Sequence, residues 1–421
     1  MKKLNVGLLL GIGALVFALG MNYRYAIDDY GIKTNTLSTS VMADGSNSGD
    51  ESGSVESGDG SGLTSTEYDT THKVITINKE NYQEKIKYSE LFDSVKYIRL
   101  ENCDDCLIAD IDKIIFFNNC FYILDKRQNI LFNFSDIGKL IWKIDKKGNG
   151  PGEYRTLMDF DLDNNRLYLY NPRVNVLEYD LSCNYLNKYP VNNVFGTSIL
   201  VNNESFYFNT CNNPTEYGNY HLLQMEHYGK SFKKGIEMTQ KNLIGKCITF
   251  NQRYSFFRYQ DKIRFFIPFS TKVFSIEKDS ISVQYFFDFK NNNLPESFFE
   301  NNTYEDLKKF SSYAYGFNSF WENNLFIYFN INLMENNWDF LYSKQDNKLI
   351  YGYFSDDIAF CWPKFQIVND DFAIGFRTMD ELFNEYNYSK EERKNTVLKE
   401  IIDISNDDDN PVLLIYYFKK F

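Results

Sequence analysis

Short runs of aromatic and aliphatic residues, separated by turn-forming residues, occupy the chain from Val74 to its end. The first clear group comprises residues 121–125, 130–134 and 139–144, with a turn at residues 136–138. Runs of this length, rich in Phe, Tyr, Ile and Val and bounded by Asn, Asp or Gly, are typical of β-strands joined by tight turns. We therefore expect a meander of antiparallel strands.

The same group of strands recurs along the chain. Later copies begin near residues 166, 205, 262, 324 and 371, which makes about six copies at a spacing of roughly 45 to 60 residues, the range expected of propeller blades. A sheet of about four strands cannot bury both faces alone, whereas stacking of such sheets around an axis does so. The pattern therefore predicts an all-β fold, a six-bladed β-propeller.

A ring of blades must close on itself, and the ends of the repeating region supply strands for this. We expect residues 95–100 to pair with the final strand, residues 412–417. Two segments interrupt the meander: a short helix-like stretch within residues 294–313, and residues 380–402, whose apolar positions follow helical spacing. The second predicts a helical insertion in the last blade that caps one end of the propeller. A partner-binding face is the alternative.

Three segments resemble those of a known family. They are residues 92–101 (FDSVKYIRLE), 148–154 (GNGPGEY) and 409–415 (DNPVLLI). They look like an exported six-bladed β-propeller family that is distantly related to NHL-repeat propellers and abundant in the envelopes of Gram-negative anaerobes. The resemblance covers most of residues 74–421. It implies the propeller fold and an exported address, in the periplasm or on the cell surface of a Gram-negative bacterium.

The N-terminal region indicates export as well. Two lysines precede an apolar run at residues 6–19 that is short for a membrane span and typical of a signal peptide. We predict a signal peptide at residues 1–20. Met21 stands where a lipoprotein would carry Cys, so membrane contact is expected only through this segment if it stays uncleaved.

The next part of the chain, residues 21–73, is predicted to be a disordered acidic tether. Its central stretch, residues 45–62, contains only Gly, Ser, Asp, Glu, Asn and Val, a composition that buries too little apolar surface to fold. Residues 1–62 also resemble, loosely, small exported peptides of the NVEALA type, although the eponymous motif is missing. The propeller itself is expected at residues 74–421.

Composition and cysteine spacing exclude some function classes. The net charge of −12 argues against nucleic-acid binding, which requires clustered Lys and Arg. The seven Cys do not form a disulfide framework. Cys103 and Cys106 suit either a local loop disulfide or free thiols, because a zinc site would need a second pair. Recurrent Asn, often doubled, is expected to form turns.

No motif identifies a catalytic centre, a metal site or a cofactor. We expect neither a metal ion nor a cofactor. Residues 161–165 resemble the start of a calcium loop, but Arg166 and Pro172 stand where Gly and Glu are required. The Gly-rich residues 148–152 lack the Lys-Ser/Thr of a phosphate loop, so a tight inter-blade turn is expected. The predicted ligand-binding residues at a mouth of the ring are Glu153, Tyr154, Arg155, Arg173, Arg258, Arg264 and Arg377.

Three functions fit these features. The first is a non-catalytic binding module in the cell envelope, whose partner is an envelope protein, a peptide or a glycan. The second is a propeller enzyme, lactonase-like or lyase-like and calcium-assisted, acting at the channel mouth. It would require carboxylates from several blades to converge on one cation, which sequence alone does not show. The third is a short exported peptide fused to a carrier. The first is the prediction carried forward.

Overall fold

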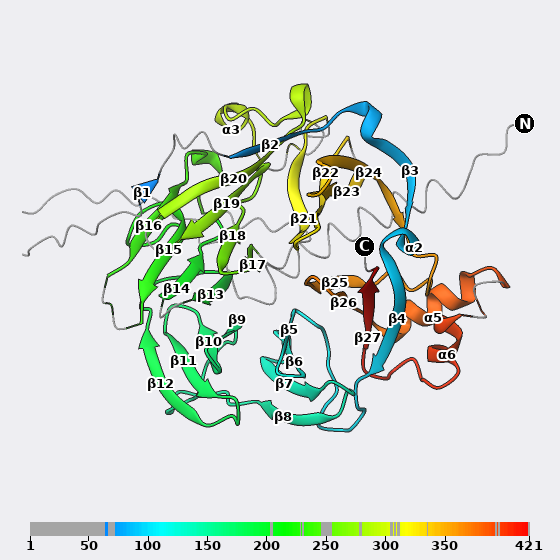
Figure 1. Ribbon diagram of the computed structural model, residues 1–421. Helices are drawn as coiled ribbons and strands as arrows, with labels where there is room; N and C mark the ends of the chain where they lie inside the picture. Colours follow the sequence, from blue (N-terminus) through cyan, green and yellow to red (C-terminus); the bar gives the residue numbers. More distant parts are fainter. Residues whose placement is uncertain are drawn as a thin grey trace, which may run out of the picture. The chain divides into compact units, whose positions relative to one another are not determined.

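The computed structural model describes residues 64–65, 72–202, 205–227, 229, 231–245, 255–277, 280–303, 306, 309, 312–334, 336–391, 394 and 396–419. The predicted signal peptide and nearly all of the predicted tether lie outside these residues. Of the helix-like residues 305–310 expected within 294–313, only Asp306 and Lys309 are described. Within the described part, six β-sheets are arranged around a common axis (Figure 1). The all-β prediction and the six-bladed propeller are therefore confirmed.

Blades 1 to 3 are simple four-stranded antiparallel meanders. Each begins at the axis and ends at the periphery. Blade 1 consists of β5 (Lys113–Phe117), β6 (Cys120–Asp125), β7 (Ile130–Ser135) and β8 (Leu140–Ile144). Blade 2 consists of β9 (Asp159–Asp163), β10 (Arg166–Asn171), β11 (Asn175–Asp180) and β12 (Tyr185–Pro190). Blade 3 consists of β13 (Ser198–Asn202), β14 (Ser205–Asn209), β15 (Tyr220–Glu226) and β16 (Lys233–Glu237).

Blades 4 to 6 each carry strands from the N-terminal part of the chain. Blade 4 contains β17 (Phe256–Tyr259), β18 (Lys262–Phe265), β19 (Lys272–Glu277) and β20 (Ser280–Asp288), with β1 (Thr64–Ser65) and β2 (Lys73–Thr76) parallel to β20. Blade 5 contains β21 (Tyr315–Glu322), β22 (Phe326–Leu333), β23 (Asn336–Ser343) and β24 (Lys348–Ser355), with β3 (Tyr82–Lys87) parallel to β24. Blade 6 contains β25 (Lys364–Val368), β26 (Phe372–Arg377), β27 (Val412–Phe418) and β4 (Phe92–Arg99).

The N-terminal segment therefore runs along the outer edges of three successive blades (Figure 1). Its last strand, β4, closes the ring by pairing antiparallel with β27 over the register from Val412–Arg99 to Phe418–Phe92. We call this pairing the clasp. It confirms the predicted ring closure between the early strand and the final strand. The segments 92–101 and 409–415, which carry the family resemblance, are thus the two halves of the clasp.

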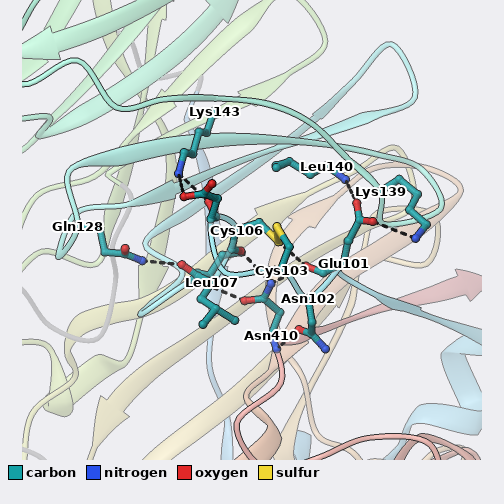
Figure 2. The surroundings of a disulfide bond; sticks show 12 residues. Glu101, Asn102, Cys103, Cys106, Leu107, Gln128, Lys139, Leu140, Lys143 and Asn410 are labelled. Atoms are coloured by element: carbon teal, nitrogen blue, oxygen red, sulfur yellow. Dashed lines mark hydrogen bonds and ion pairs between the residues drawn. A yellow bond between two sulfur atoms is a disulfide. The ribbon is translucent and has the colours of Figure 1, made fainter.

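The Asn410 side chain makes most of the hydrogen bonds that fasten the linker after β4 to the start of β27. Asn410 is 4% exposed, and its amide nitrogen donates to the carbonyl oxygens of Glu101 at 2.8 Å and Cys106 at 2.9 Å. Its amide oxygen accepts the backbone N–H of Ile108 at 2.8 Å. A Cys103–Cys106 disulfide closes the same turn (Figure 2). Of the two alternatives that the sequence left open for these cysteines, the structure has the disulfide.

Hydrophobic side chains fill each interface between neighbouring blades, so that there are six inter-blade cores in place of one central core. Aromatic side chains dominate these cores; Phe206 and Phe208 between blades 2 and 3 are examples. The core between blades 3 and 4 is the smallest of the six and contains Tyr207 and Ile276. A cleft described below lies at this sparse interface.

Helices are few. The short ones are η1 (Lys79–Asn81), α2 (Tyr88–Leu91), η2 (Lys241–Leu243), η3 (Lys290–Asn292) and α3 (Phe298–Asn301). The predicted helical insertion in the last blade is present, but as two helices, α5 (Met379–Tyr388) and α6 (Val397–Ile402). The expectation of a single helix over residues 380–402 was therefore wrong. Leu382 of α5 and both Leu398 and Ile401 of α6 are fully buried in the core between blades 5 and 6, and the break lets both helices bury their apolar sides there.

Candidate functional site

The GNGPGEY segment forms the linker between blades 1 and 2. The carboxylate of Glu153 accepts the backbone N–H of Gly150 at 2.7 Å, and a Cβ on Gly148 would lie 1.9 Å from that carboxylate. Tyr154 has no exposed surface, and its hydroxyl lies 2.8 Å from the carbonyl oxygen of Asn129. Burial raises the pKa of the Tyr154 phenol above its ordinary value. This linker is the expected tight turn, and its glycine at 148 leaves space for the Glu153 carboxylate.

The predicted arginines do not converge. Arg155 donates to the Asn149 side chain at 2.7 Å, and the guanidinium of Arg173 lies 4.9 Å from the ring centroid of Phe195. Arg377 pairs with Glu381 at the start of α5, at 3.1 Å. Arg258 and Arg264 both belong to blade 4 but point into different surroundings, described next. The seven predicted ligand-binding residues therefore lie in several separate places and do not make one pocket.

Charged side chains form hydrogen bonds with backbone groups at the inner edges of the blades. The ammonium group of Lys113 donates to the backbone carbonyl of Phe160 at 2.7 Å and to the carboxylate of Asp159 at 3.0 Å. The other oxygen of Asp159 accepts the backbone N–H of Ile199, on the inner strand of blade 3, at 2.8 Å. Unpaired backbone groups at the edge of a sheet invite pairing with other chains. These side chains remove that hazard at the axis.

Asp161 and Arg258 continue this network across three blades. Asp161 accepts the backbone N–H of Val201 at 2.7 Å. The guanidinium of Arg258 donates to both carboxylate oxygens of Asp161, at 3.0 and 2.6 Å. The Arg258 side chain keeps 36% of its surface accessible. Burial opposes its charge, but the ion pair with Asp161 outweighs that cost, so the pKa of Arg258 lies above its ordinary value. Arg258 is thus the predicted site residue that reaches the axis.

Arg264 belongs to a buried ion cluster between blades 4 and 5. Glu322 is fully buried and accepts from Arg264 at 2.8 Å, Lys344 at 2.8 Å and the Tyr285 hydroxyl at 2.5 Å. The ammonium group of Lys344 also lies 3.9 Å from the ring centroid of Tyr259. Burial and the Glu322 carboxylate raise the pKa of Tyr285 above its ordinary value. The cluster joins two blades, and Arg264 is engaged within it.

The hairpin turns between the first and second strands of the blades all lie at one mouth of the ring, because all six first strands run in the same direction. We call this mouth the rim. Asn118 and Asn119, and again Asn164 and Asn165, adopt positive φ in two of these turns. Asn tolerates this conformation better than most residues. The expectation that doubled Asn forms turns holds at these positions.

Neighbouring rim turns are tied together around part of the ring. The Asn324 side chain of blade 5 accepts from the Tyr259 hydroxyl of blade 4 at 2.9 Å. The backbone N–H of Asn324 donates to Asp370 of blade 6 at 2.7 Å. Asn118 of blade 1 donates to Asn165 of blade 2 at 3.4 Å. Polar amides and carboxylates of this kind line the rim and remain near solvent.

A cleft of about 310 Å³ opens at the rim between blades 3 and 4. Such a volume is at the lower end of the usual size of small-molecule sites, about 300–1,000 Å³. Its floor is apolar, since Tyr207 and Ile276 belong to the inter-blade core. Its walls are polar, and Lys262 pairs at 2.9 Å with Glu277, on the neighbouring strand of the same blade. The lining residues are Asn202, Ser205, Tyr207, Asp261, Lys262, Ile276 and Glu277.

One buried amide behind this cleft is only half satisfied. The nitrogen of the Gln224 side chain donates to the hydroxyl of Ser205, a lining residue, at 3.2 Å. The amide oxygen of Gln224 is buried and has no hydrogen-bond partner in the described part of the chain. Buried polar groups are normally paired. The Gln224 amide therefore holds Ser205 from behind and is not itself a lining group of the cleft.

None of the predicted site residues lines this cleft. The lining residues come from turns and strand ends that carry no motif, so the useful sequence feature was the recurrence of Asn at the first turn of the blades. Among the described residues, no group of three or more His, Cys, Asp or Glu is placed to hold a metal ion. In the same part of the chain, none of the helices is both long and apolar enough to cross a membrane.

Solved structures share the fold at low sequence identity. The "Putative exported protein" of Bacteroides fragilis NCTC 9343 superimposes with a TM-score of 0.67 and 20% identity, covering 83% of this chain and 100% of that one. This likeness supports the propeller fold. A DUF4221 member from Bacteroides vulgatus ATCC 8482 (TM-score 0.45, 8% identity, 78% and 97% covered) and virginiamycin B lyase from Staphylococcus aureus (0.36, 10%, 63% and 76%) are too distant to carry an argument.

Sequence comparison assigns the chain to a family. No curated protein sequence matches it. A family model does match, over residues 72–417, which is nearly all of the described chain, and its description is "Domain of unknown function (DUF4934)". The NHL relationship and the NVEALA-like leader stay predictions. Because the match spans the complete ring of blades together with the clasp, the chain belongs to the DUF4934 family.

Proposed function

We propose that this protein is an exported, non-catalytic binding module of the cell envelope, and that it holds a polyhydroxylated ligand, such as the end of a glycan, in the cleft between blades 3 and 4. The observation that carries the proposal is the cleft itself. It has a volume of about 310 Å³ and an apolar floor under polar walls. This combination is usual for sites that bind small ligands.

The lining groups favour a ligand rich in hydroxyl groups. Asp261 and Glu277 supply carboxylate acceptors, Asn202 and Ser205 supply groups that both donate and accept, and Lys262 is already paired with Glu277. Two carboxylates against one ammonium leave the cleft with an excess of negative charge. Anionic ligands are therefore disfavoured, whereas sugar hydroxyls donate well to carboxylates.

Export is proposed on three grounds. The predicted signal peptide precedes the ring, a structural likeness that covers 83% of the chain is to a protein named for export, and the Cys103–Cys106 disulfide suits an oxidising compartment. The axial carboxylates lend no support to a calcium-assisted enzyme, because Asp159 and Asp161 are engaged with Lys113, Arg258 and backbone amides. The binding role is therefore the function we put to the test.

The test is direct binding to defined oligosaccharides. The full chain is screened against an array of neutral, amino and acidic oligosaccharides, and the strongest hits are titrated by calorimetry. We expect Asp261→Asn and Glu277→Gln each to weaken binding about tenfold, since a hydrogen bond to a charged group contributes about 1.5–3 kcal/mol. Asp136→Asn, an equal charge change at an exposed turn of blade 1, is the matched control. Unchanged binding in the cleft variants, or no neutral or amino oligosaccharide bound, would overturn the proposal.

A further inference from the structure

The Cys103–Cys106 disulfide belongs to a surface turn beside the clasp (Figure 2). Its two ends differ in access, since Cys103 is an exposed residue and Cys106 has no exposed surface. Any thiol that attacks this bond must therefore approach from the Cys103 end. Exposed disulfides exchange more readily with other thiols than buried ones do, and they are often regulatory. The access to this bond makes it a candidate for exchange.

Global stability does not explain why the chain has this disulfide. The bond joins residues with a sequence separation of 3, and a cross-link stabilises a protein less as the loop that it closes becomes shorter. A chain of 421 residues also buries enough apolar surface to fold without covalent staples. The role of the disulfide therefore follows from what the turn contacts.

The turn contacts both sides of the place where the ring closes. Asn410, just before β27 of blade 6, donates from one amide nitrogen to the carbonyl oxygens of Glu101 at 2.8 Å and Cys106 at 2.9 Å. On the other side, the ammonium group of Lys143 in blade 1 donates to the carbonyl oxygen of Asp105 at 2.7 Å (Figure 2). The turn therefore bridges blades 6 and 1, and its shape decides whether both carbonyls reach Asn410 together.

The reduced form of the turn also has partners for its buried groups. The Cys106 sulfur lies 3.0 Å from the carbonyl oxygen of Glu101, so a Cys106 thiol would have an acceptor for its S–H. Without the disulfide, a backbone hydrogen bond from the N–H of Cys106 to the carbonyl oxygen of Cys103, at 3.0 Å, still closes the turn. Both redox states are therefore accessible without a buried unpaired thiol, as a reversible switch requires.

We propose that the Cys103–Cys106 disulfide is a redox switch of the clasp, and that a dithiol reductant operates it. A thiolate of the reductant attacks the Cys103 sulfur, the S–S bond breaks, and its electron pair goes to Cys106, which takes a proton from water. The second thiol of the reductant then attacks its own sulfur in the mixed disulfide and releases Cys103, which is protonated in turn. The reductant is oxidised to a disulfide, and the protein gains two electrons and two protons. The freed turn holds Asn410 less firmly, so the clasp opens more often.

The experiment follows the redox state and the clasp in the same samples of the full chain. The chain is equilibrated in dithiothreitol buffers of increasing ratio of reduced to oxidised reagent, and isotope-coded alkylation with mass spectrometry reports the state of each cysteine. Hydrogen exchange is measured on every sample. On reduction, we expect exchange to rise about tenfold more in β4 and β27 than in blade 2, and to return on reoxidation. A rise of equal size around the ring would show that the disulfide acts only as a staple, and would refute the switch.

Two variants and one small thiol complete the test. The double variant Cys103→Ser, Cys106→Ser should show the opened clasp at every buffer ratio, whereas Cys120→Ser, at a free cysteine of blade 1, should switch as wild type. Cysteamine, which has one thiol, should form its mixed disulfide on Cys103. A mixed disulfide on Cys106, or a bond that stays oxidised in fully reduced dithiothreitol while the chain is folded, would overturn the proposal. If the double variant fails to fold, the wild-type series still decides the question. None of these outcomes bears on the oligosaccharide cleft, which is tested separately.

Discussion

Asn410 is expected to be one of the most destabilising positions to change, because its side chain makes three hydrogen bonds between the start of β27 and the linker after β4. Asn410→Ala removes three hydrogen bonds, to the carbonyls of Glu101 and Cys106 and from the N–H of Ile108, at 2.8 to 2.9 Å. The alanine methyl group replaces none of them at a site that is 4% exposed. Each lost bond is worth about 1 kcal/mol, and more where a buried partner stays unpaired.

The expected total is a loss of about 3–5 kcal/mol in the free energy of unfolding. For a ring of this length, an unfolding entropy of about 2.1 cal/mol/K per residue converts that loss to a fall of about 4–7 °C in the thermal midpoint. Midpoints are measured by circular dichroism at one fixed scan rate, because a chain of this size need not unfold in two states.

Two controls accompany this measurement. Asn219→Ala, at an exposed asparagine, should change the midpoint by less than about 1 °C. Asn102→Ala removes only the acceptor for the backbone N–H of Asn410, at 2.7 Å, and should cost about 1 kcal/mol. Hydrogen exchange should increase in β4 and β27 of the Asn410 variant and not in blade 2. A midpoint within about 1 °C of wild type, or exchange that rises evenly around the ring, would refute the role of Asn410.

Four further outcomes are expected. Glu322→Gln leaves the buried Arg264 and the partly buried Lys344 without a counter-charge. It should cost about 3–5 kcal/mol, measured as a lowered thermal midpoint; a loss below about 1 kcal/mol would contradict the cluster. Burial lowers the pKa of His221 to about 4, below the ordinary value near 6.5. The unfolded chain therefore gains the proton first, so His221 alone should lower stability by up to about 3 kcal/mol as pH drops from about 6.5 to 4. Burial also lowers the pKa of His227 to about 4, so His221→Gln should lose only its own part of the slope. Reducing the Cys103–Cys106 disulfide, which closes a very short loop, should cost only about 2 kcal/mol in denaturant titrations with and without reductant. Mass spectrometry of the chain exported by a Gram-negative host should find Met21 as the first residue, and an intact N-terminus would contradict cleavage.

Much of the fold was predictable because it is local. Within a blade, residues that pair are joined by a turn of a few residues, so period-two strands and turn-forming Asn specify each hairpin. Asn118 and Asn119 illustrate this, since both adopt the positive φ that their turn requires. The clasp was predictable for a different reason. A ring needs one pairing between its ends, and residues 95–100 and 412–417 are strand-like segments at the two ends of the repeating region.

The candidate sites were not predictable in this way. Arg258 and Asp161 are 97 positions apart, and Glu322 meets Arg264 across a separation of 58. The sequence identified the arginines as binding residues because they lie among aromatics. It did not show that Arg264 would pair with Glu322 in a buried ion cluster, or that Tyr154 would be fully buried in a linker. Those outcomes depend on how blades stack, which no periodicity records.

By itself, the sequence determined the blades, their number, the strand that closes the ring and the helical insertion, because each follows from spacing along the chain or from the need to close a sheet-based ring. Tertiary structure alone decided which polar groups remain available. Charges at the axis pair across blades, whereas the polar walls of the cleft between blades 3 and 4 stay open. The physical reason is that packing between blades brings together side chains that are far apart in sequence. This packing determines which hydrogen-bonding groups pair with one another and which remain able to bind a ligand.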